Sequence, residues 1–177
     1  SVKLIGADKL HGAGVLGGTH AVAILDTGID KDSAVLAGDI VAQGCFSTAT
    51  SSIYNVKTLC PNGLDMSLLP DAATGCPGDL AGCDHGTHVA GIVTGQQLQH
   101  DGKTFGGVSP GAKIVPIQVF TRFDDADACV ASPGGAPCVL SFTSDQLRAL
   151  DWIYKNRDKH KIASVNMSLG GGYNDSH

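Results

Sequence analysis

The chain is organised around residues 84–93, which read Asp84-His85-Gly86-Thr87-His88-Val89-Ala90-Gly91-Ile92-Val93. The histidines, glycines and hydroxyl of this stretch precede an apolar run of helical length, so we expect a helix from about Gly86 to Thr94. Such a helix holds the His85 imidazole at its N-terminal end, where the positive end of the helix dipole disfavours protonation. A neutral imidazole is what a general base needs near pH 7. On this stretch alone two other interpretations stay open, with His85 and His88 as zinc ligands or His85 as an ordinary helix-entry residue.

Composition narrows the class of protein. The chain has 177 residues, of which 42% are hydrophobic and 16% are charged, and this favours one globular domain with its own core. A formal net charge of −5 and the absence of a basic run argue against nucleic acid as a partner. No apolar run approaches the roughly 20 residues of a membrane helix, so a membrane is not expected either. The sequence starts at Ser1 without a signal-peptide pattern, and we expect any signal or pro-segment to have been removed.

The cysteines predict disulfide bonds. Their number is even, none forms a Cys-x-x-Cys pair, and all lie in loop-like sequence: Cys45, Cys60, Cys76, Cys83, Cys129 and Cys138. We therefore expect three disulfides and an oxidising, extracellular compartment. Spacing leaves the connectivity open, but Cys129 with Cys138 is the favoured pair, because Pro133-Gly134-Gly135 lets the short segment turn back. A disulfide bond at Cys83 would connect the preceding region to the chain segment that holds His85.

Three runs predict strands of a parallel sheet, and the first two of them have the apolar pattern of buried strands. They are residues 21–25, 113–120 and 162–169, the last of which ends in glycines 170–172. Pro116 lacks an amide donor, so pairing of the second strand should be one-sided there. Thr143 and Gln146 have the spacing of a capping box, which predicts a helix with Thr143 as N-cap. Strand, helix, strand, helix, strand predicts an α/β domain with right-handed crossovers.

Two long segments show no sustained period. The first, residues 38–83, is rich in cysteine, glycine and proline, and it predicts a surface insertion stapled by disulfides, with a short strand near Ile40. The second, residues 121–142, is expected to be loop. Its aspartates Asp124, Asp125 and Asp127 are either solvated or grouped around a calcium ion.

Asp26 directly follows the first predicted strand, in the triplet Asp26-Thr27-Gly28. Open α/β sheets place their chemistry at the carboxyl ends of buried strands, so this carboxylate is a candidate functional group. Aspartic proteases use the same triplet. Their mechanism needs two carboxylates that share a proton, and no second Asp-Thr-Gly or Asp-Ser-Gly occurs in these residues.

Three stretches in order closely resemble the subtilisin-like serine proteases, or subtilases. They are residues 23–30 (AILDTGID), 85–91 (HGTHVAG) and 165–171 (VNMSLGG), and residues 107–112 (GVSPGA) are similar to the turn that precedes a strand in that family. The resemblance runs from about residue 4 to 172. It implies a subtilisin-like three-layer α/β fold with a mostly parallel central sheet, in which residues 1–177 are the N-terminal part of the catalytic domain.

The resemblance also implies roles for single residues. Asp26 would accept a hydrogen bond from Nδ1 of His85, at roughly 2.6–3.2 Å, and fix the tautomer of the ring. His85 would be the general base and then the general acid, while His88 would be structural and packed behind the helix start. Ser168, Leu169 and Gly170 match the edge segment that pairs with the substrate backbone in this family.

The sequence departs from the family in two places that matter for catalysis. The nucleophile lies in a Gly-Thr-Ser-Met-Ala-type motif in the family, and no such motif occurs here. The oxyanion asparagine, which follows the Ser-Leu-Gly-Gly segment in the family, is also missing, because Asn166 precedes that segment. We therefore expect this chain to be inactive alone, with the C-terminal remainder of the same protease as its partner, together with a peptide or protein substrate and a removable propeptide.

The prediction is a secreted serine endopeptidase that uses a Ser-His-Asp triad, to which this chain contributes Asp26 and His85. No cofactor is required for that chemistry. A structural calcium ion is compatible with the resemblance, although Val35 stands where the family often has a ligand aspartate. The alternative is a non-catalytic module derived from a subtilase, which captures peptides along Ser168, Leu169 and Gly170.

Overall fold

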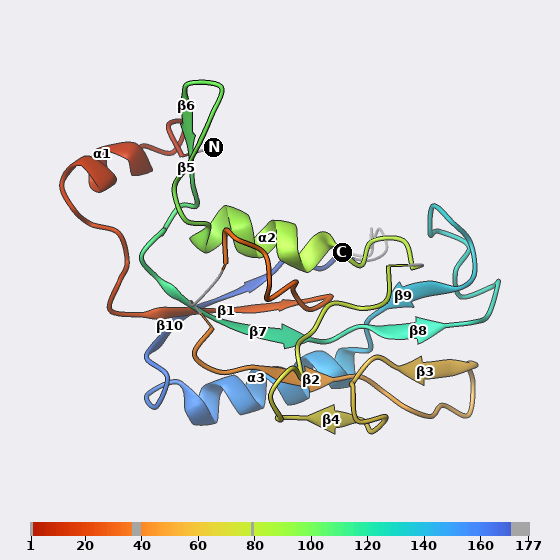
Figure 1. Cartoon of the computed structure of the whole chain (residues 1–177). Coiled ribbons are helices and arrows are strands. Elements are labelled where there is room, and N and C mark those ends of the chain that lie inside the picture. Colours follow the sequence, from red (N-terminus) through yellow and green to blue (C-terminus); the bar gives the residue numbers. More distant parts are fainter. Residues whose placement is uncertain (1, 37–39, 79, 171–177) are drawn as a thin grey trace, which may run out of the picture.

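A computed structural model of the chain describes residues 2–36, 40–78 and 80–170 (Figure 1). Gly171 and Gly172 of the predicted third-strand end lie outside this part of the chain. The helices are α1 (Ala7–Gly12), α2 (His85–Thr94) and α3 (Thr143–Asn156). The strands are β1 (Ala21–Asp26), β2 (Gly44–Phe46), β3 (Val56–Thr58), β4 (Met66–Ser67), β5 (Leu98–His100), β6 (Lys103–Phe105), β7 (Lys113–Gln118), β8 (Thr121–Phe123), β9 (Cys138–Leu140) and β10 (Ile162–Met167).

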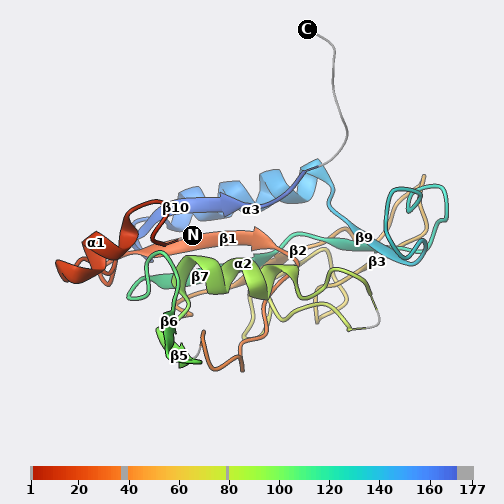
Figure 2. The ribbon, with the colours of Figure 1, turned by 90° about the horizontal axis from the view of Figure 1, so that it is seen from above.

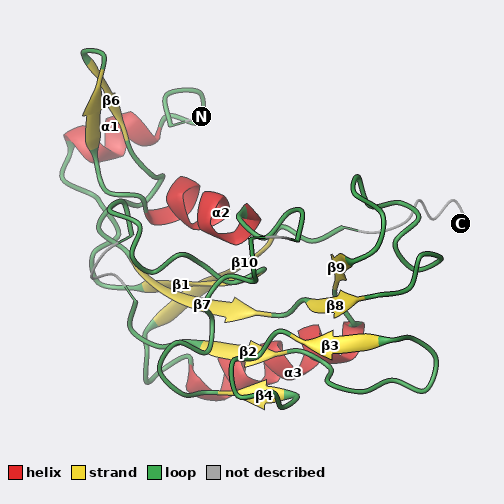
Figure 3. Ribbon diagram, turned by 45° about the vertical axis from the view of Figure 1, so that its right-hand side comes forward, coloured by secondary structure: helices red, strands yellow, loops and turns green. Residues whose placement is uncertain are grey.

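The central sheet is mostly parallel, as predicted. Its strand order is β10-β1-β7-β2-β4, and β1 pairs in parallel with both β7 and β10. β2 continues the parallel arrangement next to β7, and β4 adds an antiparallel edge (Figure 3). The two strands with the longest apolar runs therefore lie in the middle of the sheet, where both of their faces can be covered.

One helix covers each face of this sheet, which gives three layers (Figure 2). On the α3 side, Ala23 and Leu25 of β1 pack with Ala149 and Ile153 of the helix. On the α2 side, Ile24 of β1 packs in a second cluster with helix residues such as Val89 and Ala90. Successive side chains of β1 thus enter opposite cores, because side chains alternate along a strand, and this is why residues 21–25 are all apolar.

Pro116 interrupts the sheet on one side only. The β1 ladder pairs with every residue of β7, including Ile24 opposite Pro116. On the other side, β2 pairs only with Ile117 and Gln118, and the next contact is a bridge between Ile40 and Ile114. The prediction of one-sided pairing at this proline is confirmed.

The prediction of a surface insertion at residues 38–83 is wrong in part. The segment is mostly irregular, but its Gly44–Phe46 strand joins the central sheet and is fully buried. Phe46 packs in the same core cluster as Leu25 and Ile117. The expected strand near Ile40 is reduced to the single bridge with Ile114. The region is therefore an integral part of the core, and a three-residue strand is too short to show a period in sequence.

Residues 121–142 are not simply loop. β8 pairs with β9 on one side and with β3 of the preceding region on the other, and they form a small antiparallel sheet (Figure 3). Phe123, Phe142 and Tyr54 gather against it, with ring centroids 5.2–6.4 Å apart. This second sheet extends the molecule beyond the carboxyl end of β7.

The six cysteines form three disulfides, as predicted. The pairs are Cys45–Cys60, Cys76–Cys83 and Cys129–Cys138. The favoured pairing of Cys129 with Cys138 is confirmed, and Cys83 is bonded two residues before His85, as considered above. Among the described residues no helix is long and apolar enough to cross a membrane.

The predicted capping box is wrong. Thr143 is the first residue of α3 rather than its cap, the N-cap is Phe142, and that cap makes no side-chain hydrogen bond. Asp145 anchors the start of α3 instead, with a fully buried carboxylate that accepts hydrogen bonds from Thr48 and Arg148. The helix is thus fixed by a long-range contact to the region after β2, which the local pattern cannot reveal.

This anchor predicts a difference between two substitutions in the first turn of α3. Asp145→Ala should lower the free energy of unfolding by about 2 kcal/mol, because it removes a buried carboxylate that accepts hydrogen bonds from the half-buried Thr48. Thr143→Ala, the matched control, should cost well under the roughly 1 kcal/mol of a true N-cap. Urea unfolding followed by circular dichroism measures both. A larger loss for the Thr143 variant would restore the capping box.

Candidate active site

The site lies at the carboxyl edge of the central sheet. β1 ends there at Asp26, and the segment that follows β10 begins there at Ser168, because Leu25 is opposite Met167 in the parallel register. α2 starts at the same edge with His85 (Figure 1). Parallel strands bring their carboxyl ends to one side of a sheet, which is why residues far apart in sequence meet here.

His85 and Asp26 form a direct hydrogen bond. Nδ1 of His85 donates to Oδ1 of Asp26 at 2.8 Å, inside the predicted range. The Asp26 side chain is 1% exposed and the His85 side chain is 47% exposed. Because Nδ1 is engaged with the buried carboxylate, Nε2 is the ring nitrogen left for chemistry on the open side. This geometry matches what a general base with an orienting carboxylate needs.

Asp26 is held by its own backbone as well. Oδ1 also accepts the amide hydrogen of Thr27 at 2.8 Å. Oδ2 is buried and has no hydrogen-bond partner within the part of the chain that the structure describes.

Thr27 joins the strand end to the helix start. Its hydroxyl accepts the amide hydrogen of Gly86 at 3.0 Å and donates to the carbonyl oxygen of Cys83 at 3.2 Å. One buried side chain therefore fixes the backbone on both sides of His85. Sequence reasoning placed Thr27 in the motif without giving it this role.

Two glycines lie where the start of α2 meets the turn after β1. A Cβ atom at Gly86 would lie 2.1 Å from the carbonyl oxygen of Gly28 and 3.2 Å from Asp26. Gly28 itself has φ +81° and lies against the carbonyl oxygens of Ala73 and Thr74. A side chain at Gly86 would push α2 away from the end of β1, whereas one at Gly28 would collide with the backbone of Ala73 and Thr74. The glycine at 86 is therefore a requirement of the Asp26–His85 distance, and the glycine at 28 allows the turn after β1 to pack against residues 73–74.

Gln118 supports the site from the neighbouring strand. It is fully buried at the end of β7, opposite Asp26 in the register. Its Nε2 donates to the carbonyl oxygen of Thr27 at 2.9 Å, and its Oε1 accepts the amide hydrogen of Phe120 at 2.8 Å. The sequence analysis missed this residue. Its signal was an amide side chain at the end of the apolar residues 114–117, which implies a buried hydrogen-bonding partner.

His88 is not packed behind the helix start, and this prediction is wrong. The residue is exposed, whereas Gly86, Val89 and Ala90 of α2 are buried. Residues of a helix advance by about 100° each, which places His88 nearly opposite the buried face. The zinc hypothesis also finds no support, because His85 binds Asp26 and no three potential ligand side chains gather anywhere in the described ranges.

A pocket of about 300 Å³ opens beside His85. The predicted substrate-binding residues Ser168, Leu169 and Gly170 line it, together with Phe120 and residues 132–139. The structure thus brings all five predicted site residues to one place. The contribution of residues 132–139 was not foreseen, because nothing in a proline- and glycine-rich segment indicates where it folds.

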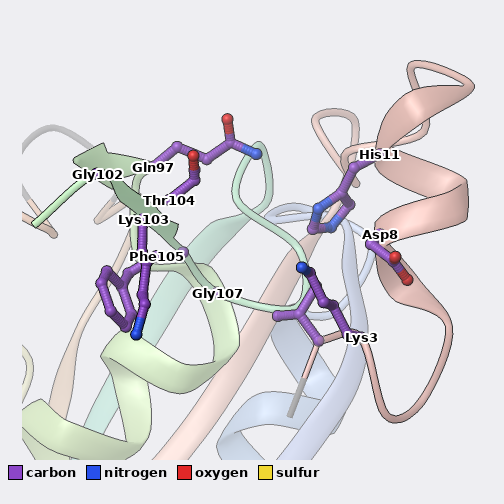
Figure 4. A pocket seen from close by; sticks show the side chains of 11 residues that line it. Lys3, Asp8, His11, Gln97, Gly102, Lys103, Thr104, Phe105 and Gly107 are labelled. Carbon is purple, nitrogen blue, oxygen red and sulfur yellow. The ribbon is translucent and has the colours of Figure 1, made fainter. Parts of the chain in front are cut away.

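A larger hollow, of about 730 Å³, lies at the other end of α2 (Figure 4). Lys3, Asp8 and His11 from the N-terminal segment face the β5–β6 hairpin across it. His11 donates from Nε2 to the carbonyl oxygen of Val108 at 2.9 Å, which ties α1 to the body of the protein. The hollow contains neither Asp26 nor His85, so size alone does not identify the site.

The aspartates at 124–127 do not form an ion site with one another. Asp124 binds Arg122 at 2.7 Å and Lys57 at 3.0 Å, and these hydrogen bonds hold the pKa of its carboxyl group below the usual value. Asp125 accepts the amide hydrogen of Asn55. A structural calcium ion elsewhere in the protein stays a prediction.

Comparison with known proteins gives a consistent result. The profile of the Subtilase family matches residues 17–177. Fervidolysin of Fervidobacterium pennivorans is 35% identical over 153 residues, and a subtilisin-like protease of Coccidioides posadasii is 27% identical over 172 residues. A subtilase-type proteinase of Schizosaccharomyces pombe is 36% identical over 97 residues.

These relatives are much longer than the chain. The matches cover 86%, 96% and 53% of the chain, but only 17%, 29% and 16% of the three relatives, in the same order. The chain therefore corresponds to a limited part of each of them.

The Thr27 bridge predicts a measurable loss of stability. Thr27→Val keeps the shape of the side chain but leaves the buried Gly86 amide without its acceptor, so the free energy of unfolding should fall by about 1–3 kcal/mol. Thr27→Ser is the matched control, because it retains the hydroxyl group and should recover most of the loss. Urea unfolding of both variants tests this. Equal stability of Thr27→Val and the parent would show that the bridge is not needed.

Proposed function

This chain belongs to the subtilase family, and we propose that it supplies the histidine and the aspartate of a Ser-His-Asp triad in a serine endopeptidase. The observation that carries the proposal is the 2.8 Å hydrogen bond between Asp26 and His85 at the carboxyl edge of the sheet. The two residues are 59 positions apart, so their contact is produced by the fold and not by local sequence.

In this proposal His85 moves protons. Its Nε2 takes the proton of a serine hydroxyl as that oxygen attacks the peptide carbonyl, and then returns a proton to the departing amine. Asp26 stays ionised. It holds Nδ1 protonated, so that Nε2 is the basic nitrogen, and it stabilises the imidazolium form while that form exists.

Ser168, Leu169 and Gly170 would hold the substrate. They extend β10 beyond the sheet and line the pocket beside His85. A peptide that pairs with this segment in an extended conformation places its backbone along the sheet edge, in the manner of an added strand. The scissile bond then passes His85.

The nucleophilic serine and the oxyanion donor would come from a further part of the same protein. No nucleophile motif occurs in the 177 residues. β10 lies at the edge of the central sheet, and its Val165 and Met167 are 41% and 37% exposed. Parallel strands are normally covered on both faces, so we propose that the further part packs on β10 and brings the serine to His85.

We propose a secreted location for the protein. Three disulfides close within the described chain, and bonds of this kind form and persist in oxidising compartments such as the extracellular space.

The first test is Asp26→Asn in the complete protein. It should reduce turnover of a peptide substrate by about 10⁴-fold, the size known for this exchange in other Ser-His-Asp proteases, because the asparagine stabilises the wrong imidazole tautomer. Asp32→Asn is the matched control, since Asp32 is an exposed carboxylate in the next turn of chain. Circular dichroism should show both variants folded. Similar turnover of the Asp26 variant and the parent would contradict the assignment.

The second test separates a protease from a peptide-binding module. A fluorophosphonate probe should label a serine in the complete protein, and the label should map outside the 177 residues. An intact-mass measurement of the natural protein should find a species larger than 18.0 kDa or a second associated chain. Clean peptide binding without labelling would favour the module, and a soluble 18.0 kDa monomer alone would overturn the two-part proposal.

A further inference from the structure

Thr27 connects the carboxylate of Asp26 to the start of α2. Its amide hydrogen donates to Oδ1 of Asp26 at 2.8 Å, and its hydroxyl group binds both the Gly86 amide and the carbonyl oxygen of Cys83. Thr27 is 2% exposed, so its polar groups depend on partners within the protein. Oδ1 of Asp26 also accepts the hydrogen bond from His85, and the direction of this carboxylate therefore depends on the orientation of the Thr27 backbone.

Gln118 holds the carbonyl group of Thr27. The parallel pairing of β1 with β7 ends at Asp26 and Gln118, where the Val119 amide donates to the carbonyl oxygen of Asp26 at 3.0 Å. One residue further along β1, Nε2 of Gln118 donates to the carbonyl oxygen of Thr27 at 2.9 Å. The Gln118 side chain thus extends the hydrogen bonding between the two strands beyond their last register pair.

The residue after Thr27 leaves the backbone free to turn. Gly28 has φ +81°, which lies in the left-handed region that glycine adopts without a steric penalty. The peptide plane between Thr27 and Gly28 is therefore less restricted by its own backbone than the planes within β1. A hydrogen bond from a fixed side chain to its carbonyl oxygen keeps this plane in one orientation.

The Gln118 side chain is itself fixed at both ends. Its Oε1 accepts the amide hydrogen of Phe120 at 2.8 Å, and the residue is fully buried. A carbonyl oxygen can only accept a hydrogen bond and an amide nitrogen can only donate one, so the two partners together select a single orientation of the side-chain amide. An amide is also uncharged, and it makes both bonds without the cost of burying a charge beside Asp26.

We propose that Gln118 is a positioning residue for the Asp26–His85 pair, and that it acts through the Thr27 backbone rather than by contact with substrate. The inference rests on the proposed function, because it assigns a residue to the support of the general base. Loss of the side-chain amide should let the Thr27 peptide rotate. The Asp26 carboxylate should then move relative to the His85 imidazole and turnover should fall, while the protein stays folded.

The first test is Gln118→Met in the complete protein. Methionine has a similar length but can make neither hydrogen bond of the amide. The kcat for an internally quenched peptide should fall by roughly 10- to 100-fold, since a displacement of about 1 Å at a catalytic group has effects of this order. Gln146→Met is the matched control, because Gln146 is a half-buried amide on α3 that donates to Ser141. This control should keep the kcat of the parent.

Proton NMR detects the Asp26–His85 bond without any turnover. The Nδ1 proton of an imidazole that is bonded to a carboxylate resonates far downfield, and the parent should show this signal. Its absence from His85→Ala assigns it. Gln118→Met should shift the signal upfield or lose it, whereas Gln146→Met should retain it. A loss of stability alone would leave the signal of the folded protein unchanged.

Gln118→Glu tests the role of the amide by conservative exchange. A protonated carboxyl group has one donor and one acceptor, so it can bind the Thr27 carbonyl oxygen and the Phe120 amide as glutamine does. The ionised form has no donor for Thr27. Turnover relative to the parent at the same pH should therefore be close to parental at low pH and should fall as the introduced group ionises. Circular dichroism at each pH separates this loss from unfolding.

The surroundings of the introduced carboxyl group determine the direction of its pKa. Burial and the Asp26 carboxylate, opposite it on β1, raise the pKa above that of an ordinary glutamate, whereas His85 on α2 lowers it when the imidazole is protonated. On the other side, β2 places Cys45 opposite position 118, and this cysteine is disulfide-bonded and does not titrate.

The outcomes are distinct. Loss of kcat and of the downfield signal in Gln118→Met, together with recovery at low pH in Gln118→Glu, supports the positioning role. Parental kcat and an unchanged signal in folded Gln118→Met would overturn it. If Gln118→Met does not fold, Gln118→Glu decides, and a ratio to the parent that is independent of pH overturns the role. Absence of turnover and of fluorophosphonate labelling in the parent rejects the proposed function, while the downfield signal still decides whether Gln118 positions the pair.

Discussion

The hydrogen bond between Asp26 and His85 imposes a constraint on most of the surrounding structure. It joins a carboxylate that is almost completely removed from water to an imidazole that remains half exposed. A carboxylate in this position needs donors, and the Thr27 amide and His85 supply two of them to one oxygen. The donors can reach it only if the start of α2 lies directly against the turn after β1. The glycine at 86 makes that approach sterically feasible, because a Cβ atom there would collide with the carbonyl oxygen of Gly28.

Because both faces of the central sheet are covered, its inner strands carry polar functional side chains only at their ends. β1 and β7 send side chains into a core on each face, so polar side chains within them have no room until the strands end. Asp26 and Gln118 are the last residues of these strands and lie opposite each other in the register. Gln118 then satisfies the carbonyl oxygen of Thr27 and the amide of Phe120, which the exit from the sheet would otherwise leave unpaired. The end of two-sided burial therefore explains both why the functional side chain lies at the sheet edge and why Gln118 can hold the segments that leave the sheet.

Sequence reasoning succeeded where burial is continuous and failed where contacts are distant. Residues 21–25 could be assigned as a strand because alternate side chains enter two cores, and the Asp26–His85 contact followed from the family motifs. The strand at Gly44–Phe46 was not predicted, because three residues are too few to show a hydrophobic period, although Phe46 is deeply buried. The cap of α3 was misassigned because Asp145 finds its partner in Thr48, 97 positions away. His88 was misplaced because the motif gives its identity but not the face of α2 on which it lies.

The disulfides order the segments that the core cannot reach. Residues 76–83 and 129–138 contribute few apolar side chains, and a loop of that composition would otherwise sample many conformations. Each disulfide closes one of these segments at its base. The first base is joined to the end of β1 through Thr27, and the second belongs to β9 of the small antiparallel sheet. Because Thr27 also binds the Gly86 amide, the first loop and the histidine share one support. The shape of the pocket and the position of the base are therefore coupled: a change that moves the end of β1 must move both.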